Sequence, residues 1–257
     1  MVQSRSEGNG WCLWHRGPAV GRLALHAAQH TGGRGLAGTV DTGGGGVVEA
    51  WREVLGRLIP RIGLSVAGPE AQWAIIGSDA TALQGCAVTP RDIDLLAAHP
   101  GAVHRFVGLM EPYTPERCEH SSDHADWHSS KDRPMSVGPD EYGLFWHFAR
   151  WVVEGTKVEI AHIAAPEGFP TSKNGAGIWE AGPEIWPHIR HVRSGDHVLP
   201  VVPLEIQLGT CMRRGLEERA AEIVAVLRRD GYDIDLIRQA LREEHRRRFE
   251  AWIEALP

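Results

Sequence analysis

Residues 73–96 read WAIIGSDATALQGCAVTPRDIDLL, and this stretch restricts the fold more than any other part of the chain. A short apolar run ends at Gly77-Ser78, and the residues after it favour a short helix. The pattern therefore predicts a buried strand, a tight turn and a helix. Residues 90–98 alternate in polarity and predict a second strand, which makes residues 73–96 a strand–helix–strand unit.

The Gly77-Ser78 turn has the chemistry of a phosphate-binding site. Backbone N–H groups at the start of a helix attract anions, and glycine lets an anion approach the backbone closely. The hydroxyl of Ser78 can cap the helix or donate a hydrogen bond to the anion. Asp79 adds a negative charge beside this turn. It would repel a phosphate unless it serves as a cap for the helix.

Asp92 and Asp94 stand two residues apart in the second predicted strand. Side chains at this spacing lie on the same face, while Ile93 and Leu95 point into the core. Two neighbouring carboxylates repel each other unless a cation lies between them. Mg²⁺ prefers oxygen ligands and leaves positions open for substrate phosphates, and Mn²⁺ accepts the same ligands. The pair therefore predicts a site for Mg²⁺ or Mn²⁺.

A third carboxylate, Glu159, lies between Val158 and Ile160 in a strand-like segment. It projects away from these apolar neighbours and is either an exposed strand residue or part of the acidic site. If its strand pairs with that of Asp92 and Asp94, three acids converge. Such a group suits two-metal phosphoryl or nucleotidyl transfer, with the metals about 3.5–4 Å apart. Glu159 could then also help to activate an acceptor hydroxyl.

The segments on either side of residues 73–96 predict the rest of an α/β (α+β) fold. Helical spacing of apolar residues predicts a helix that begins at Val47 and is ended by Pro60. The other predicted segments are a helix at 101–110, a loop or insertion at about 112–140, two strands within 144–163 joined at 154–156, a loop at 165–187, short strands at 188–203, and helices at 203–229 and 234–256. This order predicts a small mixed β-sheet flanked by helices, with a C-terminal helical segment.

The chain is expected to fold as one unit over residues 47–203, followed by C-terminal helices over 204–257. Residues 1–46 are rich in glycine and show no sustained periodicity. Such a segment buries too little apolar surface to offset the entropy of ordering it, which predicts disorder. A misplaced start is the alternative, because Val47 or Val48 stands where the helical pattern begins.

Composition indicates a soluble cytoplasmic protein with no membrane partner. The formal net charge of −6 over 257 residues gives no basic face for nucleic acid. The four cysteines are scattered without a C-x-x-C pair, which argues against a disulfide framework or a structural zinc site. No apolar run approaches the roughly 18–20 residues needed to span a bilayer.

The order of these motifs resembles the DNA polymerase β-like nucleotidyltransferase superfamily. A hydrophobic strand, Gly-Ser, a helix and Asp-x-Asp follow one another, with thirteen residues between Ser78 and Asp92. The wider set of WAIIGSDATALQG, PRDIDLL, KVEI and LPVVPLEIQLGTCMRRGLEERA resembles small prokaryotic nucleotidyltransferase-domain proteins. The resemblance extends from about Gln72 to Arg229, which is most of the chain expected to fold.

The resemblance implies a role for each motif. Gly77 and Ser78 would hold the triphosphate, Asp92 and Asp94 the metal ions, and Glu159 would be the third acid. A cation for the phosphates would come from the late helix, from among Arg213, Arg214 and Arg219. The implied reaction moves a nucleoside monophosphate from a magnesium-bound nucleoside triphosphate, with ATP the expected donor, to a hydroxyl group and releases pyrophosphate. The acceptor is a small molecule, a protein or an RNA end, and the absence of a basic platform favours the first two.

Two other functions stay open. The chain could be a catalytically inactive domain of the same fold that binds a nucleotide or a partner, as antitoxin-like proteins do. It could instead be a metal-dependent hydrolase that uses His120, His124 and His128, which are four residues apart. The residues around these histidines favour turns over helix interiors, which argues for a solvated loop. Glu205 begins the late helix and is expected to cap it or to pair with an arginine.

Overall fold

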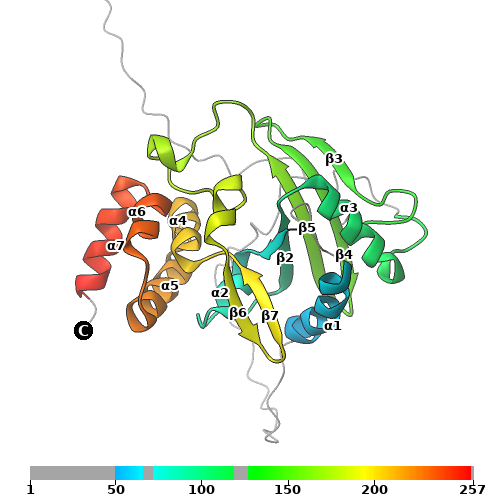
Figure 1. Cartoon of the computed structure of the whole chain (residues 1–257), viewed down its shortest axis with the longest axis horizontal. Helices are drawn as coiled ribbons and strands as arrows, with labels where there is room; N and C mark the ends of the chain where they lie inside the picture. Colours follow the sequence, from blue (N-terminus) through cyan, green and yellow to red (C-terminus); the bar gives the residue numbers. More distant parts are fainter. Residues whose placement is uncertain (1–49, 66–71, 119–126, 256–257) are drawn as a thin grey trace, which may run out of the picture.

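A seven-stranded mixed β-sheet forms the centre of the molecule in the computed structural model, which describes residues 50–65, 72–118 and 127–255 (Figure 1). The strand order is β3-β4-β5-β2-β1-β7-β6. The strands are β1 (Trp73–Ile75), β2 (Asp92–Ala97), β3 (Ser136–Pro139), β4 (Phe145–Val153), β5 (Thr156–Ala164), β6 (Arg190–Ser194) and β7 (His197–Val201). The pairs β2–β5 and β1–β7 are parallel, and the other pairs are antiparallel.

Helices flank this sheet, which confirms the predicted fold class. They are α1 (Ala50–Ser65), α2 (Gly77–Leu83), α3 (Pro100–Leu109), α4 (Leu204–Arg214), α5 (Glu217–Asp230), α6 (Ile234–Ala240) and α7 (Glu243–Ala255). In Figure 1, α1 and α3 lie on one side of the molecule, and α4 to α7 form a group on the other. No helix in the described ranges is both long and apolar enough to cross a membrane.

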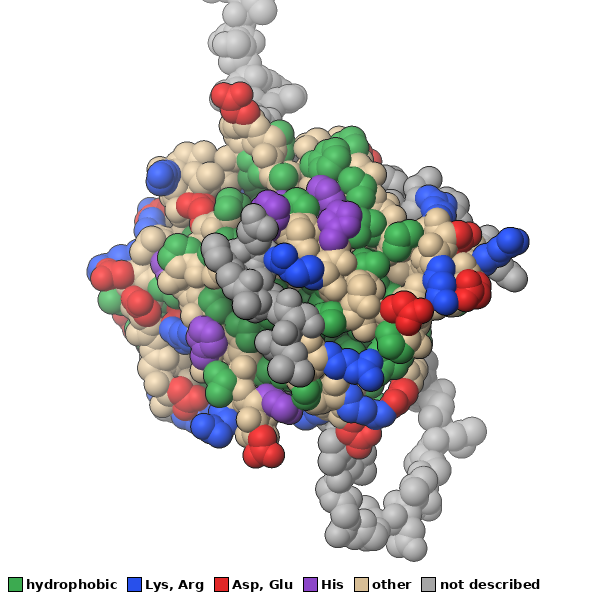
Figure 2. Space-filling view, turned by 45° about the vertical axis from the view of Figure 1, so that its right-hand side comes forward, with side chains coloured by type: hydrophobic (Ala, Val, Ile, Leu, Met, Phe, Trp, Pro, Cys, Tyr) green, Lys and Arg blue, Asp and Glu red, His purple; other side chains and the backbone are tan. Residues whose placement is uncertain are grey.

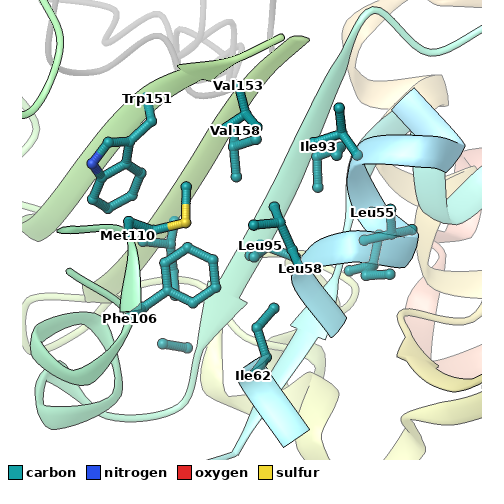
Figure 3. Packing of buried hydrophobic residues seen from close by; sticks show 14 of the residues in the cluster. Leu55, Leu58, Ile62, Ile93, Leu95, Phe106, Met110, Trp151, Val153 and Val158 are labelled. Carbon is teal, nitrogen blue, oxygen red and sulfur yellow. The ribbon is translucent and has the colours of Figure 1, made fainter. Parts of the chain in front are cut away.

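One face of the sheet packs against α1 and α3. Alternate residues of β2, β5 and β4 point to this face, among them Leu95, Val158 and Trp151. They meet Leu58 of α1 and Phe106 of α3 (Figure 3). The rings of Phe106 and Trp151 have centroids 5.8 Å apart, at a tilt of 51°. Burying these side chains is worth roughly 1.5–3 kcal/mol each and fixes which way the strands face.

The opposite face of the sheet packs against the segment 165–189 and the C-terminal helices. Leu96, Phe148 and Ala161 belong to this second cluster, together with Trp127 and Ile206. Successive strand side chains point to opposite faces, so Asp94 lies on the same face as Leu96, and Glu159 on the same face as Ala161. The acids therefore lie on the face away from α1 and α3.

Three of the predicted helices have different bounds in the structure. Pro60 lies inside α1 instead of ending it. Leu55, Leu58 and Ile62 continue one buried stripe past the exposed Pro60, so burial outweighs the hydrogen bond that a proline removes. Residues 203–229 form two helices rather than one, because the chain turns at Gly215, whose φ is +65°. Residues 234–256 are likewise divided, into α6 and α7.

The predicted loop at about 112–140 also contains regular structure. Its described residues include a 3₁₀ turn at Glu111–Tyr113 and the edge strand β3. The interpretation of residues 1–46 as disordered or mis-started concerns a segment outside the described residues.

Close packing of α4 against the end of α6 gives a stability prediction. A Cβ atom added to Gly209 would lie 2.8 Å from the carbonyl oxygen of Ala240, too close without movement of the backbone. We expect Gly209→Ala to lower the free energy of unfolding by about 1–3 kcal/mol. The matched control is Gly56→Ala in α1, where no described atom lies within 4 Å of such a Cβ. This change should raise the free energy of unfolding by about 0.5–1 kcal/mol. Urea denaturation of both variants tests the contrast, and equal shifts would contradict it.

Candidate functional site

The parallel pairing of β2 with β5 brings the predicted acids together. Asp94 is aligned with Glu159, and Asp92 with Lys157. The condition set by the sequence, that the two strands be neighbours, is therefore met. Asp94 and Glu159 lie side by side on the face of the sheet that carries Leu96 and Ala161.

Asp94 is the most unusual residue of this group. Its side chain is fully buried, and neither of its carboxylate oxygens has a hydrogen-bond partner. Burial raises the pKa of Asp94 well above its ordinary value, and the negative charges of Asp92 and Glu159 raise it further. A buried carboxylate without a partner is costly in the charged form. The site is therefore built to receive a cation or to keep a proton.

Gly77 packs directly onto this carboxylate. Its backbone has a φ of +71°, and a Cβ atom at this position would lie 2.9 Å from Oδ2 of Asp94. Glycine is thus required both by the backbone conformation and by the space. The N–H of Gly77 donates a hydrogen bond of 2.9 Å to Oε1 of Glu180. Ser78 follows in the first turn of α2 and is partly buried.

Glu180 is a site residue that no sequence pattern indicated. It comes from the segment between β5 and β6 and is 7% exposed. Its negative charge also contributes to the raised pKa of Asp94. The surrounding sequence, GIWEAGPEIW, shows no strand or helix periodicity. Nothing in it distinguishes the inward-facing Glu180 from the neighbouring Glu184.

Asp79 does not cap α2, because the N-cap position is held by Ile76. Its Oδ2 accepts a hydrogen bond of 3.1 Å from the backbone N–H of Asp94. The side chain is fully buried, its Oδ1 has no partner, and burial raises its pKa well above the ordinary value. Asp79 therefore positions the backbone of Asp94 and adds to the negative charge around it.

Glu159 is held by a buried arginine. Nε of Arg150 lies 2.7 Å from Oε1 of Glu159, with side chains that are 5% and 2% exposed. Burial raises the pKa of Glu159, and the charge of Arg150 opposes that rise. Oε2 of Glu159 has no hydrogen-bond partner. Arg150 was not identified in the sequence, although an arginine within the apolar strand FWHFARWVV was the available signal.

The three candidate arginines differ in what they contact. Arg213 donates to the carbonyl of Ile178 at 3.2 Å and to Oγ1 of Thr210 at 3.1 Å, and burial lowers its pKa to about 10. It thus holds the segment that carries Glu180. Burial also lowers the pKa of Arg214, while the charges of Glu180 and Asp94 oppose this effect. Arg214 is therefore within electrostatic range of the acids. Arg219 lies on α5 and is partly buried.

The donor atoms at this site suit a hard cation. Within the described ranges, no three His, Cys, Asp or Glu side chains are positioned to hold a metal ion together. Mg²⁺ does not require such a group, since it is commonly bound by one or two carboxylates and substrate phosphates. The two unpartnered oxygens of Asp94, with Asp92 two residues away, fit that mode.

Two other sequence predictions concern residues away from this site. His120 and His124 lie outside the described residues, so of the histidine group only His128 is described. Glu205 accepts hydrogen bonds from Nη2 of Arg190 at 2.6 Å and from the N–H of Asp233 at 3.1 Å. This confirms that Glu205 pairs with an arginine.

No protein-family model matches the chain, and no curated protein matches its sequence. Among solved structures, the chain is similar to TM1012 from Thermotoga maritima, which is provisionally described as a nucleotidyltransferase. The two are 20% identical, the match covers 69% of this chain and 95% of TM1012, and the TM-score is 0.41.

The buried, unpartnered carboxylate of Asp94 gives a prediction about stability. A carboxyl group whose pKa is raised on folding destabilises the folded state once the pH exceeds its unfolded pKa. We therefore expect Asp94→Asn to raise the free energy of unfolding at pH 7 by about 0.5–2 kcal/mol. The gain should shrink as the pH falls below about 4, because Asp94 then becomes protonated in the unfolded state as well.

Chemical denaturation at several pH values measures this difference. The exposed Asp196→Asn, in the turn between β6 and β7, is the matched control and should change stability little. A loss of stability in Asp94→Asn at neutral pH would contradict the account of the site.

Proposed function

We propose that the chain is a metal-dependent nucleotidyltransferase. It would move a nucleoside monophosphate from a magnesium-bound nucleoside triphosphate, ATP being the expected donor, to a hydroxyl group and release pyrophosphate. The observation that supports this most is the carboxylate of Asp94, buried with both oxygens unpartnered and in contact with the Gly77 turn. A purely structural acid would have hydrogen-bond partners for the same burial.

Asp92 and Asp94 would hold the metal ion, as Mg²⁺ or Mn²⁺. When bound, the ion would offset the negative charge of the phosphates and of the leaving pyrophosphate. Asp79 fixes the position of the β2 backbone through its bond to the N–H of Asp94. This contact keeps the Asp94 carboxylate beside Gly77, where the phosphates would bind.

The Gly77-Ser78 turn would bind the triphosphate, with Arg214 and Arg219 as candidate cations. Of these two, Arg214 is the better supported, because its charge interacts with Glu180 and Asp94. The N–H of Gly77 is already bonded to Glu180. A phosphate oxygen can take this donor only if the carboxylate of Glu180 moves away.

Glu159 would accept the proton of the acceptor hydroxyl. Arg150 engages Oε1, and Oε2 has no hydrogen-bond partner. A carboxylate with a raised pKa is a stronger base, and this suits proton transfer near neutral pH. As the proton moves to Oε2, the acceptor oxygen bonds to the α-phosphorus and the α–β phosphoanhydride bond breaks. Pyrophosphate leaves, and Arg150 keeps Glu159 in place throughout.

The acceptor is proposed to be a small molecule or a protein. The net charge of −6 disfavours a long RNA, which would need a basic surface.

The second candidate function is a catalytically inactive domain that binds a nucleotide or a partner. The hydrogen bond from Gly77 to Glu180 favours the inactive domain, because it occupies the N–H group that a phosphate of the nucleotide would need. Release of pyrophosphate separates the two, since an inactive domain releases none.

Binding of a nucleoside triphosphate is the first test of this function. We expect ATP, among ATP, GTP, CTP and UTP, to raise the melting temperature of the wild type in a magnesium-dependent way. A ligand at 100 times its Kd stabilises the folded state by about 2.7 kcal/mol. Asp94→Asn should lose the shift, and Asp196→Asn should keep it. Pyrophosphate release by Asp94→Asn at the wild-type rate would rule out the metal assignment.

Competition between Glu180 and a phosphate for the N–H of Gly77 gives a second test. Glu180→Gln keeps the size of the side chain and removes its charge. Once the Glu180 carboxylate has moved out into water, its repulsion of a nearby bound phosphate costs on the order of 1 kcal/mol. We therefore expect magnesium-ATP to bind a few-fold to about tenfold more tightly in calorimetry. Glu184→Gln is the matched control, because Glu184 binds Ser172 in the same segment. Weaker binding by Glu180→Gln would mean that Glu180 is a cation ligand and not a competitor.

A further inference from the structure

A row of four histidines lies on the face of the sheet opposite to the acids. His147 of β4 is the direct cross-strand partner of His162 of β5, with ring centroids 6.0 Å apart. His104 of α3 is 6.3 Å from His147, and His99, the N-cap of α3, is 6.5 Å from His162. Figure 2 shows histidine side chains grouped at the surface between hydrophobic ones. None of these four residues takes part in the proposed nucleotidyl transfer.

His162 is oriented in the way that metal-binding histidines usually are. Its Nδ1 lies 3.1 Å from the carbonyl oxygen of Ala97. A carbonyl can only accept, so Nδ1 carries the proton and Nε2 keeps its lone pair. Histidines that bind metals almost always donate their other ring N–H to a carbonyl or a carboxylate in this manner.

His147 and His162 are both partly buried. Burial lowers the pKa of His147, and the charges that His162, His104 and His99 would carry lower it further. Burial lowers the pKa of His162 as well, against the effect of its bond to Ala97. Burial thus favours the neutral form of both rings, which is the form that binds a cation. Nδ1 of His147 is buried and has no hydrogen-bond partner, so a change of tautomer breaks no bond there.

The spacing of the pair is close to that of two imidazoles on one ion. Each Zn–N bond is about 2.0–2.1 Å long, which places the ring centroids of two ligands roughly 5–6 Å apart in a tetrahedral site. The observed 6.0 Å between His147 and His162 is at the upper end of this range. No three metal-binding side chains of the described residues are already in position around one point. A third ligand therefore has to rotate into place.

We propose that His147 and His162 form a binding site for a borderline divalent transition cation such as Zn²⁺ or Ni²⁺. His104 is exposed and can turn its ring toward His147 to act as the third ligand. His99 is not a ligand, because its Nδ1 accepts a hydrogen bond of 3.1 Å from the N–H of Gly101. The bound ion joins β4, β5 and α3 on the face away from Asp94. The site is therefore independent of the proposed nucleotidyltransferase function.

Zinc binding by the full-length chain without an affinity tag tests this proposal. Zn²⁺ is titrated in competition with a chromogenic chelator, with an excess of magnesium present to occupy the acidic site. We expect the wild type to take up Zn²⁺, and the double variant His147→Asn/His162→Asn to bind it at least about 10–100-fold more weakly, the loss seen when only outer-shell partners are removed. His191→Asn, an exposed histidine of β6, is the matched control and should bind like the wild type.

An absence of Zn²⁺ uptake by the wild type, or unchanged uptake by the double variant, would overturn the proposal. If the double variant does not fold, the imidazole ¹⁵N resonances of the wild type provide the second measurement. Addition of Zn²⁺ should shift the resonances of His147 and His162 and leave those of His191 in place. Shifts confined to other histidines would also overturn the proposal.

Discussion

The parallel register of β2 on β5 is the constraint on which the rest of the structure depends. It aligns Asp94 with Glu159, and the same register places Leu95 beside Ile160 on the other face. One face of this strand pair is therefore mainly apolar where it packs against α1 and α3, while the other carries the acids. A shift of one residue would exchange the two faces, turning the acids toward α1 and α3 and moving their apolar neighbours into the acidic site. The hydrophobic core thus maintains the geometry of the acidic site.

A few buried ionisable residues account for the folding stability that the acidic site costs. Asp79 and Asp94 are fully buried acids with raised pKa values, and Arg150 is the buried cation beside Glu159. Protein interiors seldom retain charges that lack partners unless the charge has a use. The stability lost at these positions is offset by the clusters that pack on both faces of the sheet.

Much of this arrangement could be predicted because it follows the two-residue period of a strand. Alternation in DIDLL and KVEI was enough to predict that Asp94 and Glu159 each point away from their apolar neighbours. That the two acids share one face follows from the pairing of β2 with β5, which the sequence left as a condition. Glu180 could not be predicted, because its segment has no period and only the tertiary fold turns it toward Gly77. The end of α1 was predicted wrongly for a related reason. Local propensity at Pro60 favours a stop, and the buried stripe that continues past it is a tertiary effect.

The close contact at the carbonyl of Ala240 joins distant parts of the chain. Gly209 of α4 and Gly177 both approach this oxygen so closely that neither position has room for a side chain. Gly177 precedes Glu180 by three residues, and Arg213 holds the carbonyl of Ile178 between them. The C-terminal helices therefore hold residues 177 and 178 in place, and the same segment carries Glu180, whose carboxylate accepts a hydrogen bond from the N–H of Gly77. The position of the Glu180 carboxylate beside Gly77 therefore depends on how α6 packs against α4 and against Gly177.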